Sequence, residues 1–308
     1  MDYSQFKEKV KDALQEHFLG RGEVYYESVI KTNDTKREAV VLWQYEMEVR
    51  PAIYLEDLYS RYRRSGNFKK CVNEVIRACE APVFISEKMV PRKWGTAKPK
   101  VFMRVVNREW NKEILENAPY VEYLDLAVIF YILIKEEGDL MATLQIDRQR
   151  MDTWGVDEQG MWTAAMENLE KEKFQIKLAS AVMENVMIEM GGSEEGEDLG
   201  KELKEAEESG MGQLYQVCNA SRKYAARAIL RKDLLKKYAK KLGGNFYILP
   251  SSMHEILLLK DDGTVTTEEL KEMVYDVNHH SDVIKPEERL SDSVYYYDEG
   301  TDTVEIAS

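Results

Sequence analysis

Ser251, Ser252, His254 and Glu255 are the side chains of this sequence best suited to chemistry. Within one short turn they supply hydroxyl groups, an imidazole and a carboxylate, which are the parts of a nucleophile activated by a base. The spacing is therefore compatible with a hydrolase or a transferase. In an extended strand, however, His254 and Glu255 point to opposite faces. The same side chains would then only satisfy the hydrogen bonds of a turn.

The segment that follows Asn219 offers a surface for anions. The sequence predicts one helix over residues 222–242, in which Asp233 is the single acid among many lysines and arginines on the solvent side. With Asn219 and Arg222 as further contacts, this helix would suit phosphate groups or a nucleic acid, although an ordinary solvated helix has the same pattern. Arg231 falls within the apolar stripe, so its head group either extends to solvent or meets a carboxylate or carbonyl group inside.

A second basic segment, residues 91–100, sets Trp94 among positive charges that include Lys93. A base stacked on the indole, with a phosphate on Lys93, would bind single-stranded nucleic acid; the alternative is an exposed connection between strands. The whole chain carries 43 Lys and Arg against 56 Asp and Glu, a net charge of −13. That charge disfavours nucleic acid and anionic membranes as partners.

Metal and cofactor sites are not predicted. The 4 His and 3 Cys residues lack the spacing of zinc ligands, and no phosphate-binding glycine loop or zinc-protease motif occurs. We expect Cys71, Cys79 and Cys218 to be reduced thiols. The first residues carry charges throughout, and the longest apolar run, residues 126–134, is shorter than the about 20 residues of a membrane span. These features predict a cytoplasmic protein.

The elements that must position these groups alternate between helix and strand. Hydrophobic spacing predicts a first helix up to residue 18, a hairpin around Asn33 and Asp34, and a helix that begins at Asp157. Further strands are predicted in the ranges 101–106, 123–134, 140–146, 213–218, 246–249 and 253–259. Thr266 and Glu269 form a capping box that opens a last helix before a terminal hairpin. Because strands follow one another directly, we expect an α+β fold with mixed or antiparallel sheets and helices packed on them.

Residues 191–212 differ from the rest in being rich in glycine and acidic side chains. They cannot bury enough apolar surface to offset chain entropy. We expect a flexible acidic linker, cut first by proteases, between an N-terminal α+β domain (1–190, with a subdomain break near 110–120) and a C-terminal α+β domain (213–308).

Four stretches together resemble a known family: PAIYLED (51–57), MDTWGV (151–156), YILPSSMHE (247–255) and LSDSVY (290–295). They are similar to an uncharacterised domain-of-unknown-function family of Gram-positive gut bacteria, marked most specifically by the "YILPSS-x-HE" element. The resemblance covers nearly the whole chain. It implies a bacterial cytoplasmic protein and no particular reaction.

The sequence favours a non-catalytic binding or regulatory module whose partner, a protein of unknown identity, contacts the C-terminal domain. The absence of a catalytic motif, the charged linker and the aromatic-rich C-terminus lead to this hypothesis. The first alternative is the hydrolase or transferase at Ser251, Ser252, His254 and Glu255. The second is nucleic-acid binding through helix 222–242 and the Trp94 loop. The oligomeric state is not predicted.

Overall fold

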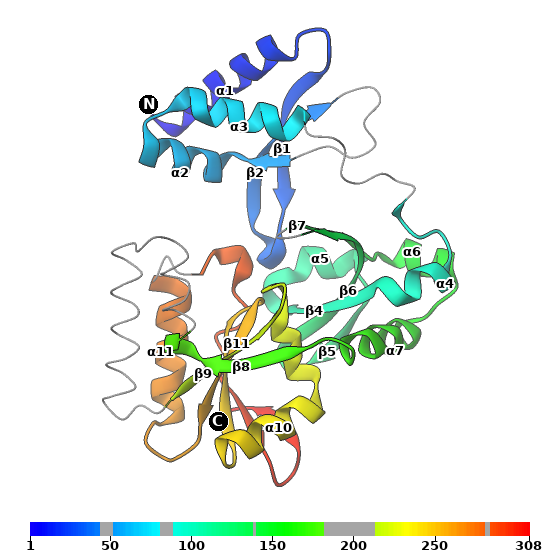
Figure 1. Cartoon of the computed structure of the whole chain (residues 1–308), viewed down its shortest axis with the longest axis vertical. Coiled ribbons are helices and arrows are strands. Elements are labelled where there is room, and N and C mark those ends of the chain that lie inside the picture. Colours follow the sequence, from blue (N-terminus) through cyan, green and yellow to red (C-terminus); the bar gives the residue numbers. More distant parts are fainter. Residues whose placement is uncertain (44–51, 81–88, 138–139, 182–212, 281–283) are drawn as a thin grey trace. The chain divides into compact units, whose positions relative to one another are not determined.

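The computed structural model describes residues 1–43, 52–80, 89–137, 140–181, 213–280 and 284–308 (Figure 1). The chain divides into two compact units: unit 1 comprises residues 1–92 and 134–142, and unit 2 comprises residues 93–133 and 143–308. Within the described residues, no helix has both the length and the apolar character that crossing a bilayer requires.

Unit 1 combines helices with a small antiparallel sheet, in the strand order β1-β2-β3. Its elements are α1 (Tyr3–His17), β1 (Glu23–Ile30), η1 (Thr32–Asp34), β2 (Lys36–Trp43), β3 (Ala52–Tyr54), α2 (Leu55–Ser65) and α3 (Phe68–Glu80). Phe6, Val10 and Leu14 form the buried face of α1, as their spacing predicts. The predicted hairpin is confirmed, and its turn residues Asn33 and Asp34 both have positive φ, 62° and 47°.

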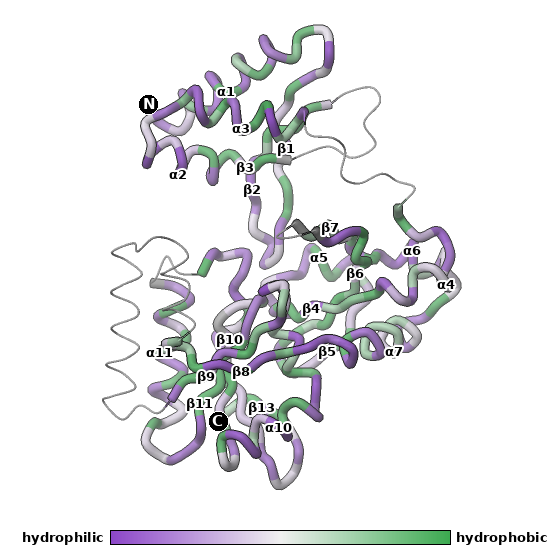
Figure 2. The backbone as a smooth tube through the Cα atoms, in the orientation of Figure 1, coloured by the Kyte–Doolittle hydropathy of each residue, from purple (hydrophilic) through white to green (hydrophobic). Residues whose placement is uncertain are grey.

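Unit 2 holds two antiparallel sheets. The first has the order β4-β6-β5, with β7 also paired to β6. Its strands and helices are α4 (Trp94–Ala97), η3 (Lys98–Lys100), β4 (Val101–Asn107), η4 (Glu109–Asn111), α5 (Lys112–Asn117), β5 (Tyr120–Tyr123), β6 (Leu126–Glu137), β7 (Leu140–Gln145), α6 (Arg148–Trp154) and α7 (Glu158–Leu169). The end of β6 from residue 134 and the start of β7 up to residue 142 are counted with unit 1. The apolar run along β6, visible in Figure 2, is buried on both faces. Asp157 caps α7 through the Gly160 amide, as predicted.

The second sheet of unit 2 has six strands in the order β13-β12-β10-β11-β9-β8. Its elements are β8 (Phe174–Leu178), β9 (Leu214–Asn219), η5 (Ala225–Leu230), α10 (Lys232–Leu242), β10 (Phe246–Ser252), β11 (Glu255–Lys260), α11 (Thr267–His280), η6 (Pro286–Glu288), β12 (Tyr295–Asp298) and β13 (Thr303–Ile306). Leu270 and Val274 of α11 pack with Leu249 and Leu259 on one face of this sheet. The predicted α+β fold is confirmed.

The predicted single helix over 222–242 is wrong. The chain instead forms the 3₁₀ helix η5 and the α-helix α10, separated at Arg231, whose φ and ψ are −95° and 87°. All six residues of η5 are buried, and η5 contacts β4, β9 and β11. Because η5 is buried, it cannot form the solvent-exposed basic face that the sequence pattern predicted. Within residues 222–242, the exposed lysines all lie in α10.

The described segments on either side of residues 191–212 belong to one sheet, and the predicted domain boundary there stays a prediction. β8 precedes residues 191–212 and β9 follows them, and the two strands pair directly from Phe174↔Asn219 to Leu178↔Tyr215. The predicted linker itself lies outside the described residues. Segments on both sides of it therefore contribute neighbouring strands to one sheet of unit 2.

Candidate functional site

Asn219 at the end of β9 fixes the short loop that leads into η5. Its side-chain amide nitrogen donates to Glu172 Oε1 (2.6 Å) and to the Lys223 carbonyl (2.9 Å). Its Oδ1 accepts from the Lys223 amide (3.1 Å) and from Ser221 Oγ (3.3 Å). Asn219 is buried, so these bonds hold the loop without competition from water.

The same loop has an unfavourable backbone at two positions. Arg222 and Tyr224 lie in the left-handed region, with φ of 51° and 55°. Residues with side chains rarely adopt this conformation, which costs of order 1–3 kcal/mol each and persists only where the surroundings enforce it. The two residues flank Lys223. Their backbone angles therefore set the direction in which the Lys223 and Tyr224 side chains leave the loop.

His254, in the turn between β10 and β11, packs against this loop. Its Nδ1 accepts a hydrogen bond from the Tyr224 amide (3.2 Å), and the two rings lie 5.3 Å apart. Because Nδ1 is the acceptor, the neutral imidazole carries its proton on Nε2, which lies 4.0 Å from Glu288 Oε1. Burial, and then the charges of Lys223 and Arg104, lower the pKa of His254 to about 4. The imidazole is therefore neutral at physiological pH.

Arg104 completes the group from the middle of β4. Its guanidinium lies over the Tyr224 ring, 5.5 Å from Cζ to the centroid. Its Nε is buried and makes no hydrogen bond, and none of the carboxylates that the structure describes forms an ion pair with it. A buried donor without a partner costs about 1–3 kcal/mol. We refer to Arg104, Lys223, Tyr224 and His254 as the Arg104 cluster.

Arg227 of η5 lies behind the cluster and is fully paired. It forms an ion pair with Glu172 (2.7 Å) and donates to the Met103 carbonyl (3.1 Å) and to the Tyr131 hydroxyl (2.8 Å). The Tyr131 ring in turn contacts Tyr224, with 5.6 Å between the centroids. Tyr131 and Glu172, despite the cost of burying the guanidinium, hold the pKa of Arg227 above its usual range. Arg227 thus packs behind the cluster with its charge balanced, while Arg104 has no counter-ion among the described residues.

The structure brings the side chains of Ser252 and Glu255 together, but the His254 imidazole faces Tyr224 instead. Ser252 Oγ donates to Glu255 Oε1 (3.4 Å) and accepts from the His254 amide (3.1 Å). Glu255 also accepts from Gln216 (2.6 Å), and burial raises the pKa of Glu255. A register shift between Leu249 and Ser252 replaces simple strand alternation at this turn. The side chain of Ser251 lies outside the described part of the structure.

The remaining predicted residues lie in other settings. Arg231 is buried and meets Asp233 through two bonds of 2.7 Å and the Leu169 carbonyl at 2.6 Å; the carbonyl is the internal partner considered for it, whereas Asp233 is 65% exposed. Trp94 packs against Trp154, with 6.0 Å between centroids, and Lys93 is exposed before α4. Arg222 is exposed at the strained loop.

Arg104 and Tyr224 were not identified from the sequence. Arg104 is the single charge within the apolar strand VFMRVVN, and a charged residue in such a strand is the signal that could have found it. Tyr224 lies in the range 222–242, for which the sequence predicts one helix rather than a loop. No group of three or more His, Cys, Asp or Glu side chains in the described ranges could hold a metal ion.

Comparison with known proteins gives a family and no function. The model of a family of unknown function (DUF5688) matches residues 3–299, so the chain belongs to that family. No curated protein and no solved structure matches the chain.

Proposed function

We propose that this member of the family of unknown function DUF5688 is a non-catalytic binding module that takes up an anionic group, a phosphate or a carboxylate, at the Arg104 cluster. The observation that carries the proposal is the Arg104 guanidinium: its buried Nε makes no hydrogen bond, and it forms no ion pair with any residue that the structure describes. A folded protein normally satisfies such a group, and an unsatisfied one requires an explanation such as an absent ligand.

The position of Arg104 suits anion recognition. Tyr224 supports one face of the guanidinium, which limits its motion at little cost in hydrogen-bonding capacity. Arg104 is partly exposed, so its terminal nitrogens can donate to two oxygens of one phosphate or carboxylate. Arginine is the preferred partner of such groups because its donors have a fixed, planar arrangement.

The neighbours of Arg104 strengthen the attraction. Lys223 adds a second positive charge next to Tyr224, whose amide bonds to His254, and, together with burial, both Lys223 and Arg104 lower the pKa of His254. His254 is neutral and carries its proton on Nε2, since Nδ1 is taken by the Tyr224 amide; Nε2 lies 4.0 Å from Glu288 Oε1, so His254 adds no positive charge to the site. The strained loop that presents Lys223 and Tyr224 is also typical of ligand sites.

The contacts of the Ser252 turn support a binding role over hydrolysis. A serine nucleophile needs an imidazole at hydrogen-bond distance from its oxygen. Ser252 Oγ has Glu255 and the backbone of His254 as partners, whereas the imidazole ring faces Tyr224. These contacts describe a stabilised turn beneath a binding loop.

We also propose a bacterial cytoplasm as the setting. The resemblance of the sequence to a family of Gram-positive gut bacteria supports this origin. The thiols of Cys71, Cys79 and Cys218 are free, which suits a reducing compartment.

Isothermal titration with inorganic phosphate and, separately, with citrate tests the proposal and separates the two anion classes. The wild-type chain should bind at least one of them, and Arg104→Gln should weaken that binding at least tenfold. Arg108→Gln is the matched control, because Arg108 follows the same strand and pairs with the exposed Glu122. Its binding should equal that of the wild type. Binding of neither anion, or equal binding by Arg104→Gln, would refute the proposal.

A further inference from the structure

β13 forms one edge of the six-stranded sheet. It pairs with β12, from Tyr295↔Ile306 to Asp298↔Thr303, and within the described residues it has no neighbour on its other side. The outer side of an edge strand presents backbone N–H and C=O groups that another chain can pair with. Extended peptides bind many domains by adding a strand at such an edge.

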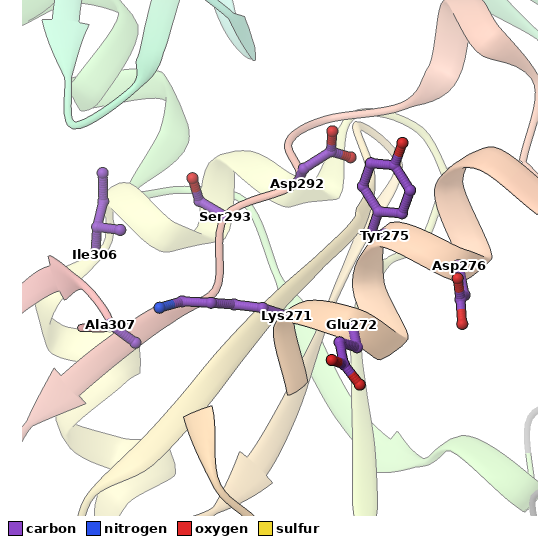
Figure 3. Close-up of a pocket in the computed structure, with 8 residues that line it drawn as sticks. All are labelled: Lys271, Glu272, Tyr275, Asp276, Asp292, Ser293, Ile306 and Ala307. Carbon is purple, nitrogen blue, oxygen red and sulfur yellow. The ribbon is translucent and has the colours of Figure 1, made fainter. Parts of the chain in front are cut away.

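A surface hollow of about 540 Å³ adjoins this edge, between α11 and the C-terminal end of β13. In Figure 3, Lys271 and Tyr275 of α11 face Ser293 and Asp292, and Ile306 and Ala307 close the opposite end. The Tyr275 and Ile306 side chains, which line the hollow, are 49% and 42% exposed. Large apolar side chains gathered at a hollow are typical of a binding surface.

One wall of the hollow is held rigidly. Asp292 accepts a hydrogen bond from the buried Asn278 (2.8 Å) and pairs with His279 Nε2 (3.0 Å). The His279 ring stacks on Tyr275, with 4.3 Å between the centroids. Tyr275 is therefore fixed before any partner arrives, which lowers the entropy cost of binding.

The charges around the hollow indicate the chemistry of the partner. Glu272 and Asp276 are exposed on α11, while Lys271 is the single cation among the lining residues that the structure describes. A partner with lysine or arginine next to an apolar residue would complement this surface.

We propose that an extended segment of a partner protein adds to β13 as a further strand and places an apolar side chain in the hollow, with a basic residue beside Glu272 and Asp276. Backbone hydrogen bonds to β13 supply affinity, and the hollow and its acidic rim supply selectivity. This surface consists of residues that do not belong to the Arg104 cluster, so the inference does not depend on the anion site.

Selection of peptides tests the proposal. A phage-displayed library of random heptapeptides is selected against the full chain, and the best peptide is synthesised with a fluorophore for anisotropy titration. The selected peptides should alternate apolar residues and carry lysine or arginine. Ile306→Asp, and the double variant Glu272→Lys with Asp276→Lys, should each weaken binding at least tenfold.

Ile30→Asp is the matched control, because Ile30 is an exposed strand isoleucine of unit 1, and its affinity should equal that of the wild type. Arg104→Gln should also bind the peptide normally. No enrichment, enrichment of acidic peptides, or equal binding by Ile306→Asp would overturn the proposal. A dimer of the wild-type chain that light scattering detects and Ile306→Asp abolishes would also overturn it, because the surface would then bind a second copy.

Discussion

The Arg227 guanidinium and the Glu172 carboxylate form a two-point ion pair inside unit 2, with Nε–Oε2 at 2.8 Å and Nη2–Oε1 at 2.7 Å. Glu172 lies just before β8 of the six-stranded sheet. The third nitrogen of Arg227 reaches Met103 and Tyr131 on the other sheet. One buried side chain therefore joins both sheets of the unit, and it does so directly behind the Arg104 cluster.

Arg227→Met should lower the free energy of unfolding by about 3–5 kcal/mol, because it leaves the mostly buried carboxylate of Glu172 without its counter-ion. Urea denaturation followed by circular dichroism measures the change. The double variant Arg227→Met with Glu172→Leu should be more stable than Arg227→Met alone, since it removes the unpaired charge. A double variant that is less stable than the single one would contradict this explanation.

Arg231→Met should lower the free energy of unfolding by a smaller amount, about 1–2 kcal/mol, in the same denaturation experiment. Arg231 also makes a two-point pair, but its partner Asp233 is 65% exposed and stays hydrated when the guanidinium is removed. The lost bond to the Leu169 carbonyl accounts for most of the expected cost. Equal losses for the two arginine variants would show that the exposure of the carboxylate is not the deciding factor.

Local features of the fold could be predicted from the sequence. The hairpin at Asn33 and Asp34, the cap at Asp157 and the capping box at Thr266 and Glu269 are all present, because each depends on neighbouring residues alone. The 3₁₀ helix η5 could not be predicted in this way. Its conformation follows from burial between two sheets, and that burial comes from residues more than a hundred positions away, such as Met103.

In the candidate site, too, the sequence indicated residues of suitable type but not the partners that tertiary packing brings to them. His254 and Asn219 drew attention because their residue types suit chemistry. The partners that give them a role, Tyr224 and Glu172, are set by the packing of the loop against β10 and β8. The role proposed for Arg104 depends on its contact with the Tyr224 ring, and no spacing along the chain predicts that contact.

The stability of unit 2 should depend strongly on Asp125. Its carboxylate accepts hydrogen bonds from Ser291 (2.5 Å), Ser293 (3.0 Å) and Tyr295 (2.7 Å), and so links the β5–β6 turn to the segment before β12. Asp125→Asn replaces one acceptor oxygen by a donor and should destabilise the protein by about 3 kcal/mol in thermal or urea denaturation.

Tyr295→Phe removes one of these three hydrogen bonds and should lower the free energy of unfolding by about 1.5 kcal/mol. Tyr297→Phe is the matched control, because its hydroxyl bonds to Asp302, which also pairs with Lys236 near the surface. An equal loss for the control would mean that removing any tyrosine–carboxylate bond has this effect, and that the Asp125 cluster makes no additional contribution.

His254 should make the stability of the protein depend on pH. Its folded pKa is about 4, below the value of about 6.5 for an exposed histidine, because the imidazole is buried beside Lys223 and Arg104. As the pH falls below 6.5, the unfolded chain binds a proton at this residue before the folded chain does. The free energy of unfolding should therefore decrease between pH 6.5 and pH 4, and His254 should have no further effect below pH 4.

His254→Asn isolates this effect, because the asparagine Oδ1 can still accept the hydrogen bond of the Tyr224 amide but does not titrate. Other groups titrate in both proteins, so the quantity to measure is the difference between wild type and variant in urea denaturation at each pH. That difference should shift in favour of the variant by no more than about 3 kcal/mol between pH 6.5 and pH 4, since each pKa unit corresponds to about 1.4 kcal/mol. The His254 side chain is 26% exposed, and hydration will reduce the shift below that limit. Parallel pH curves for the two proteins would mean that the imidazole is not held neutral by burial and the neighbouring cations, and would remove one support for the positive character of the Arg104 cluster.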